Sequence, residues 1–155
     1  ALYANAPSGV RGGSDGTVRL DNDNNLQPDA YLRYESGPSQ LTETGYLEGP
    51  PELVFEVSAS SAAYDSHEKK TAYERNGVRE YVVWRVLDGA IDWFVLRNGA
   101  YELREPNTAG VIESSVFPGL RLNVTALLAG DYAAVSREQM RSNESAVAET
   151  ETPSS

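Results

Sequence analysis

The sequence contains no cysteine and a single histidine, His67. The absence of cysteine excludes disulfides, thiolate metal sites and a cysteine nucleophile. One histidine is too few for a histidine triad or a zinc cluster, and we expect His67, beside Glu68, at the surface. The serines at 58, 60 and 61 lie in no "GxSxG" elbow, and no glycine-rich phosphate loop is present. What remains for chemistry is mainly carboxylates and lysines.

Long hydrophobic runs are also missing. The longest apolar stretches fall far short of the roughly 18 residues that a membrane-spanning helix needs. The first residues show no signal-peptide pattern. Together with the lack of cysteine, these absences favour a cytoplasmic protein without membrane association.

Positive charge is scarce as well. Lysine and arginine number 13 against 23 aspartates and glutamates, which gives a net charge of −10. Broad, non-specific nucleic-acid binding depends on many basic residues, so the composition argues against it. A local basic groove remains open, as does a metal that bridges acidic residues to a phosphate. The nine tyrosines are not interleaved with basic residues as in a single-strand-binding groove.

The length of 155 residues suggests one domain. We expect residues 1–16, rich in glycine, serine and asparagine, to be loop. The domain itself should span 17–141. The last residues, 142–155, are acidic and too polar to bury a core, so we expect a disordered tail.

Hydrophobic periodicity predicts an α/β fold with a mixed central β-sheet flanked by helices. A helix is expected over 65–77, capped by Asp65 or Ser66 and ended by Gly77. Asn98-Gly99 predicts a tight hairpin turn. The cluster "DNDNN" (21–25) is expected to be a solvated turn. The predicted strands are 17–20, 29–34, 52–58, 79–86, the hairpin 90–105 and a short one within 110–120, and the further helices are 124–130 and its extension 131–141.

The strand 52–58 carries a carboxylate, Glu56, inside the apolar run "LVFEV". Leu53, Phe55 and Val57 would share one face of this strand. Both faces are largely apolar, which predicts a central strand covered on both sides. An unpaired buried charge costs several kcal/mol, so Glu56 must have a partner, be protonated or bind something.

Asp29, Glu56 and Lys69 form a candidate site. Asp29 opens the strand before Glu56, and the following helix carries Lys69 and Lys70. Two converging carboxylates suit Mg²⁺ or Mn²⁺, and a metal there would acidify a water for phosphodiester hydrolysis. On the helix, Lys69 shares a face with Ala72 and Tyr73, so it is favoured over Lys70 as the inward lysine.

Simpler explanations stay open for each residue. Asp29 follows Pro28, and an aspartate after a proline at the start of a strand is often only a turn residue. Glu56 and Lys69 are equally well explained as a structural ion pair. Paired lysines on a helix are usually solvated.

Four motifs in order then carry a resemblance: "QPDAYLRY", "GPPELVFEVSASS", "DSHEKKTAYERNGVREYVVW" and "VFPGLRL". Over about residues 17–130 the chain resembles the bacterial Uma family of restriction-endonuclease-like proteins, within the PD-(D/E)xK nuclease superfamily. The resemblance implies the restriction-endonuclease-like form of this α/β fold and an Mg²⁺-dependent (or Mn²⁺-dependent) endonuclease that hydrolyses DNA. A homodimer is also expected.

By position, the resemblance makes Asp29 and Glu56 the metal ligands, with the Val57 carbonyl as a third. Lys69 would position or activate the attacking water, supported by Ser58 and Tyr73. In the superfamily the lysine usually stands two residues after the acid. Ser58 occupies that position here, which implies that the lysine has moved to the helix.

The resemblance also implies an additional N-terminal part, with a helix and a further acidic residue, that is not present before Ala1. We therefore expect the chain to be a fragment. The alternative function, motivated by the charge of −10, is a catalytically inactive nuclease-fold protein that serves as a nucleic-acid- or protein-interaction module.

Overall fold

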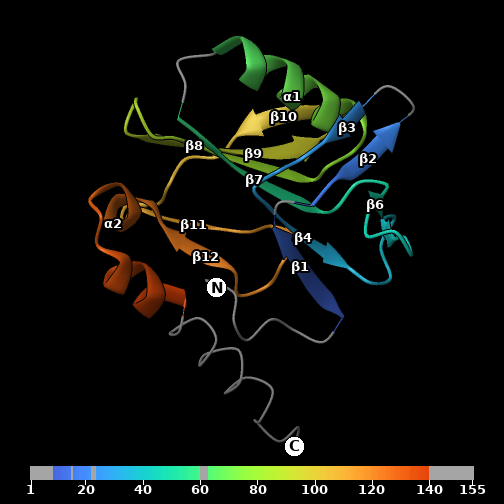
Figure 1. Ribbon diagram of the computed structural model, residues 1–155. Coiled ribbons are helices and arrows are strands. Elements are labelled where there is room, and N and C mark those ends of the chain that lie inside the picture. The colour runs from blue at the N-terminus through green and yellow to red at the C-terminus, as the bar shows by residue number, and fades with distance from the viewer. Residues whose placement is uncertain (1–8, 15, 22–23, 60–62, 140–155) are drawn as a thin grey trace, which may run out of the picture. The chain divides into compact units, whose positions relative to one another are not determined.

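The computed structural model describes residues 9–14, 16–21, 24–59 and 63–139 (Figure 1). The chain divides into two compact units. The larger unit comprises residues 7–104, and the smaller comprises 105–155 with 1–6. The expected domain limits, 17–141, stay a prediction.

The described residues form mostly short strands. In the larger unit these are β1 (Val10–Ser14), β2 (Val18–Asp21), β3 (Asn24–Leu26), β4 (Ala30–Tyr34), β5 (Gln40–Leu41), β6 (Leu47–Glu48), β7 (Leu53–Ser58), β8 (Glu80–Arg85), β9 (Ala90–Arg97) and β10 (Ala100–Leu103), with the helix α1 (Ala63–Arg75). In the smaller unit they are β11 (Val111–Glu113) and β12 (Arg121–Asn123), with the helix α2 (Val124–Leu128). Residues 132–139 are also helical.

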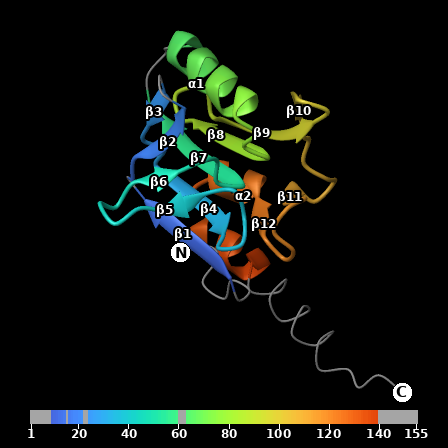
Figure 2. The same ribbon diagram turned by 90° about the vertical axis from the view of Figure 1, so that its right-hand side faces the viewer.

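The larger unit is built on a mixed sheet with the strand order β1-β4-β7-β8-β9-β10. β7 and β8 pair in parallel, and the other neighbouring strands pair antiparallel. α1 connects the two parallel strands and lies along one face of the sheet (Figures 1 and 2). The predicted mixed central sheet is therefore confirmed.

A core of buried side chains packs between α1 and the sheet. Its members are Val54, Tyr73, Val78, Tyr81 and Val83. The rings of Tyr73 and Tyr81 lie 5.1 Å apart between their centroids. Because Tyr73 comes from α1 and Tyr81 from β8, this pair joins the helix to the sheet.

The strand β7 is buried on both faces over its first half, as predicted. Leu53 and Val54 point to opposite faces, and both are buried. The burial ends at Val57, whose side chain is 42% exposed. Glu56 thus lies where the covered part of the strand meets solvent.

A second, smaller sheet has the order β3-β2-β6-β5. β2 pairs antiparallel with β3 and parallel with β6. Its strands β5 and β6 lie within 35–50, a stretch rich in glycine and proline for which the sequence predicts no strand. The smaller unit contains the hairpin-like pair β11–β12.

Several expected boundaries were wrong. The stretch 1–16, expected as loop, contains β1, which pairs with β4 despite its two glycines. α1 begins at Ala63, so Asp65 and Ser66 lie inside the helix and are not its caps. The residues directly before α1 lie outside the described residues, as do 22–23 of the predicted turn "DNDNN" and all of the predicted tail, 142–155.

The turn signals were more reliable. Gly77 adopts a φ of +83° just after α1, as a helix-ending residue does. Asn98 and Gly99 both have positive φ, at 53° and 82°, which is the tight hairpin turn that the sequence predicts. Helix 132–139 does not continue α2, because Gly130 has a φ of 77° and Asp131 caps the new helix through the Ala134 N–H.

Candidate functional site

The Glu56 carboxylate is buried between the main sheet and α1, with 6% of the residue exposed. The Tyr73 hydroxyl donates to its Oε1 over 3.1 Å. The Tyr81 hydroxyl donates to its Oε2, also over 3.1 Å. Each carboxylate oxygen therefore has its own hydroxyl donor.

Strand register explains this arrangement. In the parallel pair β7–β8, Val54 lies beside Tyr81 and Glu56 beside Val83. Because side chains alternate along a strand, Tyr81 lies on the same face of the sheet as Glu56. On α1, Lys69 and Tyr73 are four residues apart and so face the same way.

Lys69 completes the surroundings of Glu56. Its Nζ lies 3.6 Å from Glu56 Oε1, and its side chain is 41% exposed. Lys70 points elsewhere, with its Nζ 4.3 Å from the centroid of the Phe94 ring. The structure thus brings Lys69, and not Lys70, to the buried acid.

Burial raises the pKa of both Tyr73 and Tyr81, and the Glu56 charge and its hydrogen bonds raise them further. Their hydroxyls therefore keep their protons at neutral pH and remain donors to Glu56.

Asp29 directly precedes β4, the strand that pairs with β7 beside Glu56. Ala30 pairs with Phe55 across β4 and β7, so one step further along this register sets Asp29 opposite Glu56. The Asp29 Oδ2 accepts a 2.7 Å hydrogen bond from the Val57 N–H. Asp29 itself is exposed, whereas Glu56 is buried. The two acids thus lie at one level of the sheet, one accessible from solvent and one enclosed.

Ser58 and Val57, both predicted at the site, make hydrogen bonds through their backbone atoms. The Ser58 carbonyl accepts a 3.0 Å hydrogen bond from the Val86 N–H, which extends the β7–β8 pairing. Within the described ranges, no three histidine, aspartate or glutamate side chains gather into a group that could hold a metal ion. The two acids at β4 and β7 are therefore the donors to consider.

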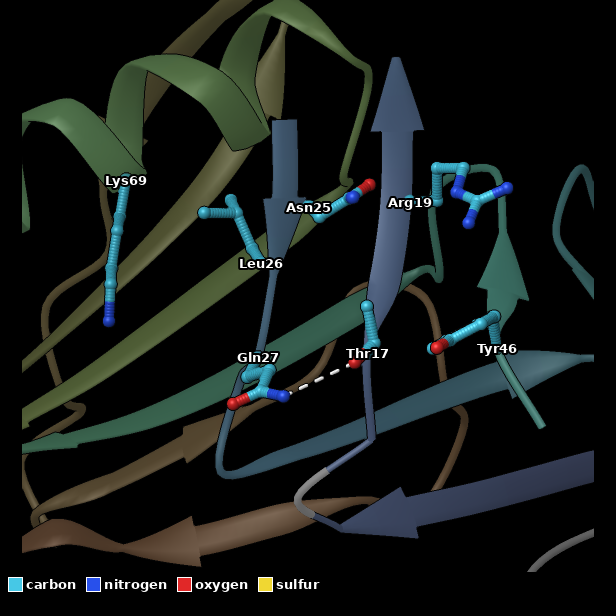
Figure 3. Close-up of a pocket in the computed structure, with 7 residues that line it drawn as sticks. All are labelled: Thr17, Arg19, Asn25, Leu26, Gln27, Tyr46 and Lys69. Carbon is cyan, nitrogen blue, oxygen red and sulfur yellow. Dashed lines mark hydrogen bonds between the residues drawn. The ribbon is translucent and has the colours of Figure 1, made fainter. Parts of the chain in front are cut away.

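A groove of about 590 Å³ opens beside Lys69. It lies between Lys69 on α1 and the small sheet, within the larger unit (Figure 3). Its lining residues are Thr17, Arg19, Asn25, Leu26, Gln27, Tyr46 and Lys69. Lys69 therefore belongs both to the groove and to the surroundings of Glu56.

Sequence reasoning placed Glu56, Lys69 and Tyr73 together but missed Tyr81. Tyr81 was expected only as part of the strand 79–86. A signal was present, since in a parallel pair with β7 every second residue of "EYVVW" must share the face of Glu56. The register that selects Tyr81 could not be read from the sequence.

A family model named Uma2, described as "Putative restriction endonuclease", matches residues 2–125. A crystal structure of a "putative nuclease belonging to DUF820" from Anabaena variabilis is similar, with a TM-score of 0.60 and 13% identity. The match covers 78% of this chain and 69% of that one. No match is found among curated proteins. In the described part of the chain, no helix has the length and apolar character to cross a membrane.

Proposed function

The chain belongs to the Uma2 family, and from this premise we propose that it is a metal-dependent endonuclease that hydrolyses DNA phosphodiester bonds. The observation that carries the proposal is the enclosed Glu56 carboxylate, with Lys69 Nζ at 3.6 Å and Asp29 on the adjacent strand. A cytoplasmic location and a homodimer remain predictions.

Asp29 and Glu56 would hold the metal. A carboxylate offers about four lone-pair positions, and the described contacts of Glu56 are three: Tyr73, Tyr81 and Lys69. Two hard carboxylates match Mg²⁺, which often binds through one or two of them and keeps several waters. We add the Val57 carbonyl as a third candidate ligand. When bound, the metal would lower the pKa of a water and neutralise charge that develops at the phosphate.

The chain's own residues supply the remaining steps. Tyr73 and Tyr81 hold both oxygens of Glu56 and so fix the direction of the carboxylate. Lys69, partly exposed, orients the attacking water or donates to a phosphate oxygen from the groove side. Asp29 accepts a hydrogen bond from the Val57 N–H, which holds it in position directly before β4.

A plasmid-nicking assay tests the proposal. The chain is incubated with supercoiled DNA and Mg²⁺ or Mn²⁺, and Glu56→Gln is compared with wild type. We expect nicking by the wild type, none in EDTA, and a loss of at least about 100-fold in Glu56→Gln, as for other groups that stabilise a transition state. Equal nicking by Glu56→Gln would refute the role of this acid.

A second function is supported by one observation: the described contacts already compensate the buried charge of Glu56. Two hydroxyls and a lysine surround it. On this account the trio is a structural ion network, and the protein binds nucleic acid or another protein without cutting.

Calorimetric titration with Mn²⁺ separates the two functions. The endonuclease should show metal binding that disappears in an Asp29→Asn variant. The binding module should show none in either protein, while both proteins keep the same thermal stability.

A further inference from the structure

The small sheet forms the floor of the groove beside Lys69 through one of its faces. Strand pairing places Arg19 beside Asn25 on β3 and beside Glu48 on β6. One step outward, Thr17 lies between Gln27 and Tyr46. Cross-strand neighbours share a face of the sheet, so two polar rows lie side by side there.

Arg19 and Tyr46 form a partly exposed cation–π pair on this face, here called the Arg19–Tyr46 platform. The guanidinium carbon of Arg19 lies 5.3 Å from the centroid of the Tyr46 ring, a cation–π distance. Tyr46 is 40% exposed, and its backbone N–H donates to Thr42 Oγ1 over 3.0 Å. The turn therefore fixes the backbone of Tyr46, and the residue remains partly open to solvent. Such a surface favours stacking with a nucleic-acid base.

Apart from Leu26, the other residues that line the groove are polar, and none of the lining residues is an acid. In Figure 3, Lys69 stands on one side and Arg19 with Tyr46 on the other. Between them, Gln27 donates to Thr17 Oγ1 over 3.2 Å. Side-chain amides such as Asn25 carry both a donor and an acceptor, which is what the edge of a base requires.

The charged side chains that line the groove are both cations, Arg19 and Lys69, whereas the chain carries a net charge of −10. Each cation has one carboxylate beside it, Glu48 at 3.5 Å from Arg19 and Glu56 at 3.6 Å from Lys69, but the two cationic side chains stay 46% and 41% exposed and can reach a ligand. The groove volume of about 590 Å³ is within the range of small-molecule pockets. The groove therefore suits an anionic ligand that has a flat ring, which describes a nucleotide.

We propose that this groove binds one unpaired nucleotide of the DNA strand, with its base on the Arg19–Tyr46 platform and its phosphate at Lys69. The nucleotide must be unpaired because a duplex hides the faces of its bases from an aromatic side chain. The inference rests on the proposed function for the identity of the polymer, and it adds single-stranded or locally opened DNA as the substrate class.

Binding of a labelled single-stranded oligothymidylate, measured by fluorescence anisotropy in EDTA, tests the groove without any cleavage. We expect Tyr46→Leu to weaken binding about tenfold and Tyr46→Phe to retain it, because stacking needs only the ring. Arg19→Ala should also weaken binding, because it removes part of the stacking platform. Lys69→Met should lower the slope of log K against log salt by about 0.7, because Lys69 is the cation at the phosphate.

Arg97→Ala is the matched control. Arg97 forms an exposed ion pair with Glu102 at 3.5 Å, the same separation as between Arg19 and Glu48. The Arg97→Ala variant should bind the oligothymidylate like the wild type. Equal weakening by Arg97→Ala and Arg19→Ala, no binding by the wild type, or tighter binding of duplex than of single strand would overturn the inference.

Cleavage is then assayed separately, which distinguishes the two proposals. If single-stranded DNA binds through Arg19 and Tyr46 but nothing is cut with Mg²⁺ or Mn²⁺, the groove stands and the endonuclease proposal fails. If DNA is cut equally well by wild type and Tyr46→Leu, and binding is unchanged, the groove proposal fails alone.

Discussion

The Tyr81 hydroxyl donates a 3.1 Å hydrogen bond to Glu56 Oε2 across the parallel strands β7 and β8. Glu56 is buried, so this bond replaces part of the hydration that its carboxyl group has lost. Tyr81→Phe should therefore lower the free energy of unfolding by about 1.5–3 kcal/mol, the range for hydrogen bonds to charged groups. Urea denaturation measures this loss.

Tyr101→Phe provides the comparison for Tyr81→Phe. The Tyr101 hydroxyl donates over 2.7 Å to a neutral acceptor, the Val78 carbonyl. Its removal should cost only about 0.5–1.5 kcal/mol. If both substitutions lower the free energy of unfolding by the same amount, the hydrogen bond from Tyr81 to Glu56 is no stronger than a bond to a neutral carbonyl, and the prediction is wrong.

Lys69 should affect activity far more than stability. Its side chain is 41% exposed, and such an ion pair contributes at most about 1 kcal/mol. Lys69→Met should therefore change the unfolding free energy by less than about 1 kcal/mol while reducing nicking at least about 100-fold. Nicking rates and urea denaturation are measured on the same preparation.

Lys70→Met is the control for Lys69→Met, because Lys70 is the next residue on α1 but lies over the Phe94 ring. It should leave the nicking rate near that of the wild type. A comparable loss of nicking in both variants would show that the effect is one of general positive charge on α1.

Part of this site could be predicted because its signals are local. Glu56 interrupts an apolar strand, and Lys69 and Tyr73 share a helix face at a spacing of four. Tyr81 and the groove could not be predicted, because both depend on strand pairing. Arg19 and Tyr46 are far apart in the sequence and meet only because β2 pairs with β6. Tyr46 and Arg19 thus lie side by side in the folded chain, although tyrosines and basic residues do not alternate along the sequence.

The fold, too, was predictable where the sequence signals are local and not where strand pairing decides. The central strand, the hairpin turn at Asn98-Gly99 and the end of α1 at Gly77 were predicted from residues with strong conformational preferences. β1 was missed because its sequence "VRGGS" has weak strand propensity. It is a strand because β4 offers it a partner, with Val10 opposite Tyr34.

Asp29 has a structural contact and a proposed metal contact, and one substitution separates them. Asp29→Asn keeps a side-chain oxygen that accepts the Val57 N–H but removes the negative charge. We expect unchanged thermal stability and clearly weaker Mn²⁺ binding by calorimetry. Asp29→Ala should lower both the thermal stability and the affinity for Mn²⁺. Unchanged metal binding in Asp29→Asn would remove Asp29 from the site.

Buried tyrosines should make the protein sensitive to alkali. The pKa values of Tyr73, Tyr81 and Tyr101 are all raised from the ordinary value of 10.0, chiefly by burial. Above pH 10 the unfolded chain therefore releases phenolic protons that the folded chain retains, so stability is full below that pH and falls above it. Each tyrosine contributes a slope of about 1.4 kcal/mol per pH unit. Urea denaturation between pH 9 and about 11.5 measures the combined slope, against which variants are compared.

Tyr101→Phe should remove about one third of the tyrosine contribution to that slope, while leaving the hydroxyls on Glu56 in place. Tyr132→Phe, at a residue that is 61% exposed, is the control and should follow the wild-type curve. A slope in Tyr101→Phe that equals the wild-type slope would mean that the Tyr101 phenol ionises alike in the folded and unfolded chains. The burial of its hydroxyl against the Val78 carbonyl would then not govern its protonation.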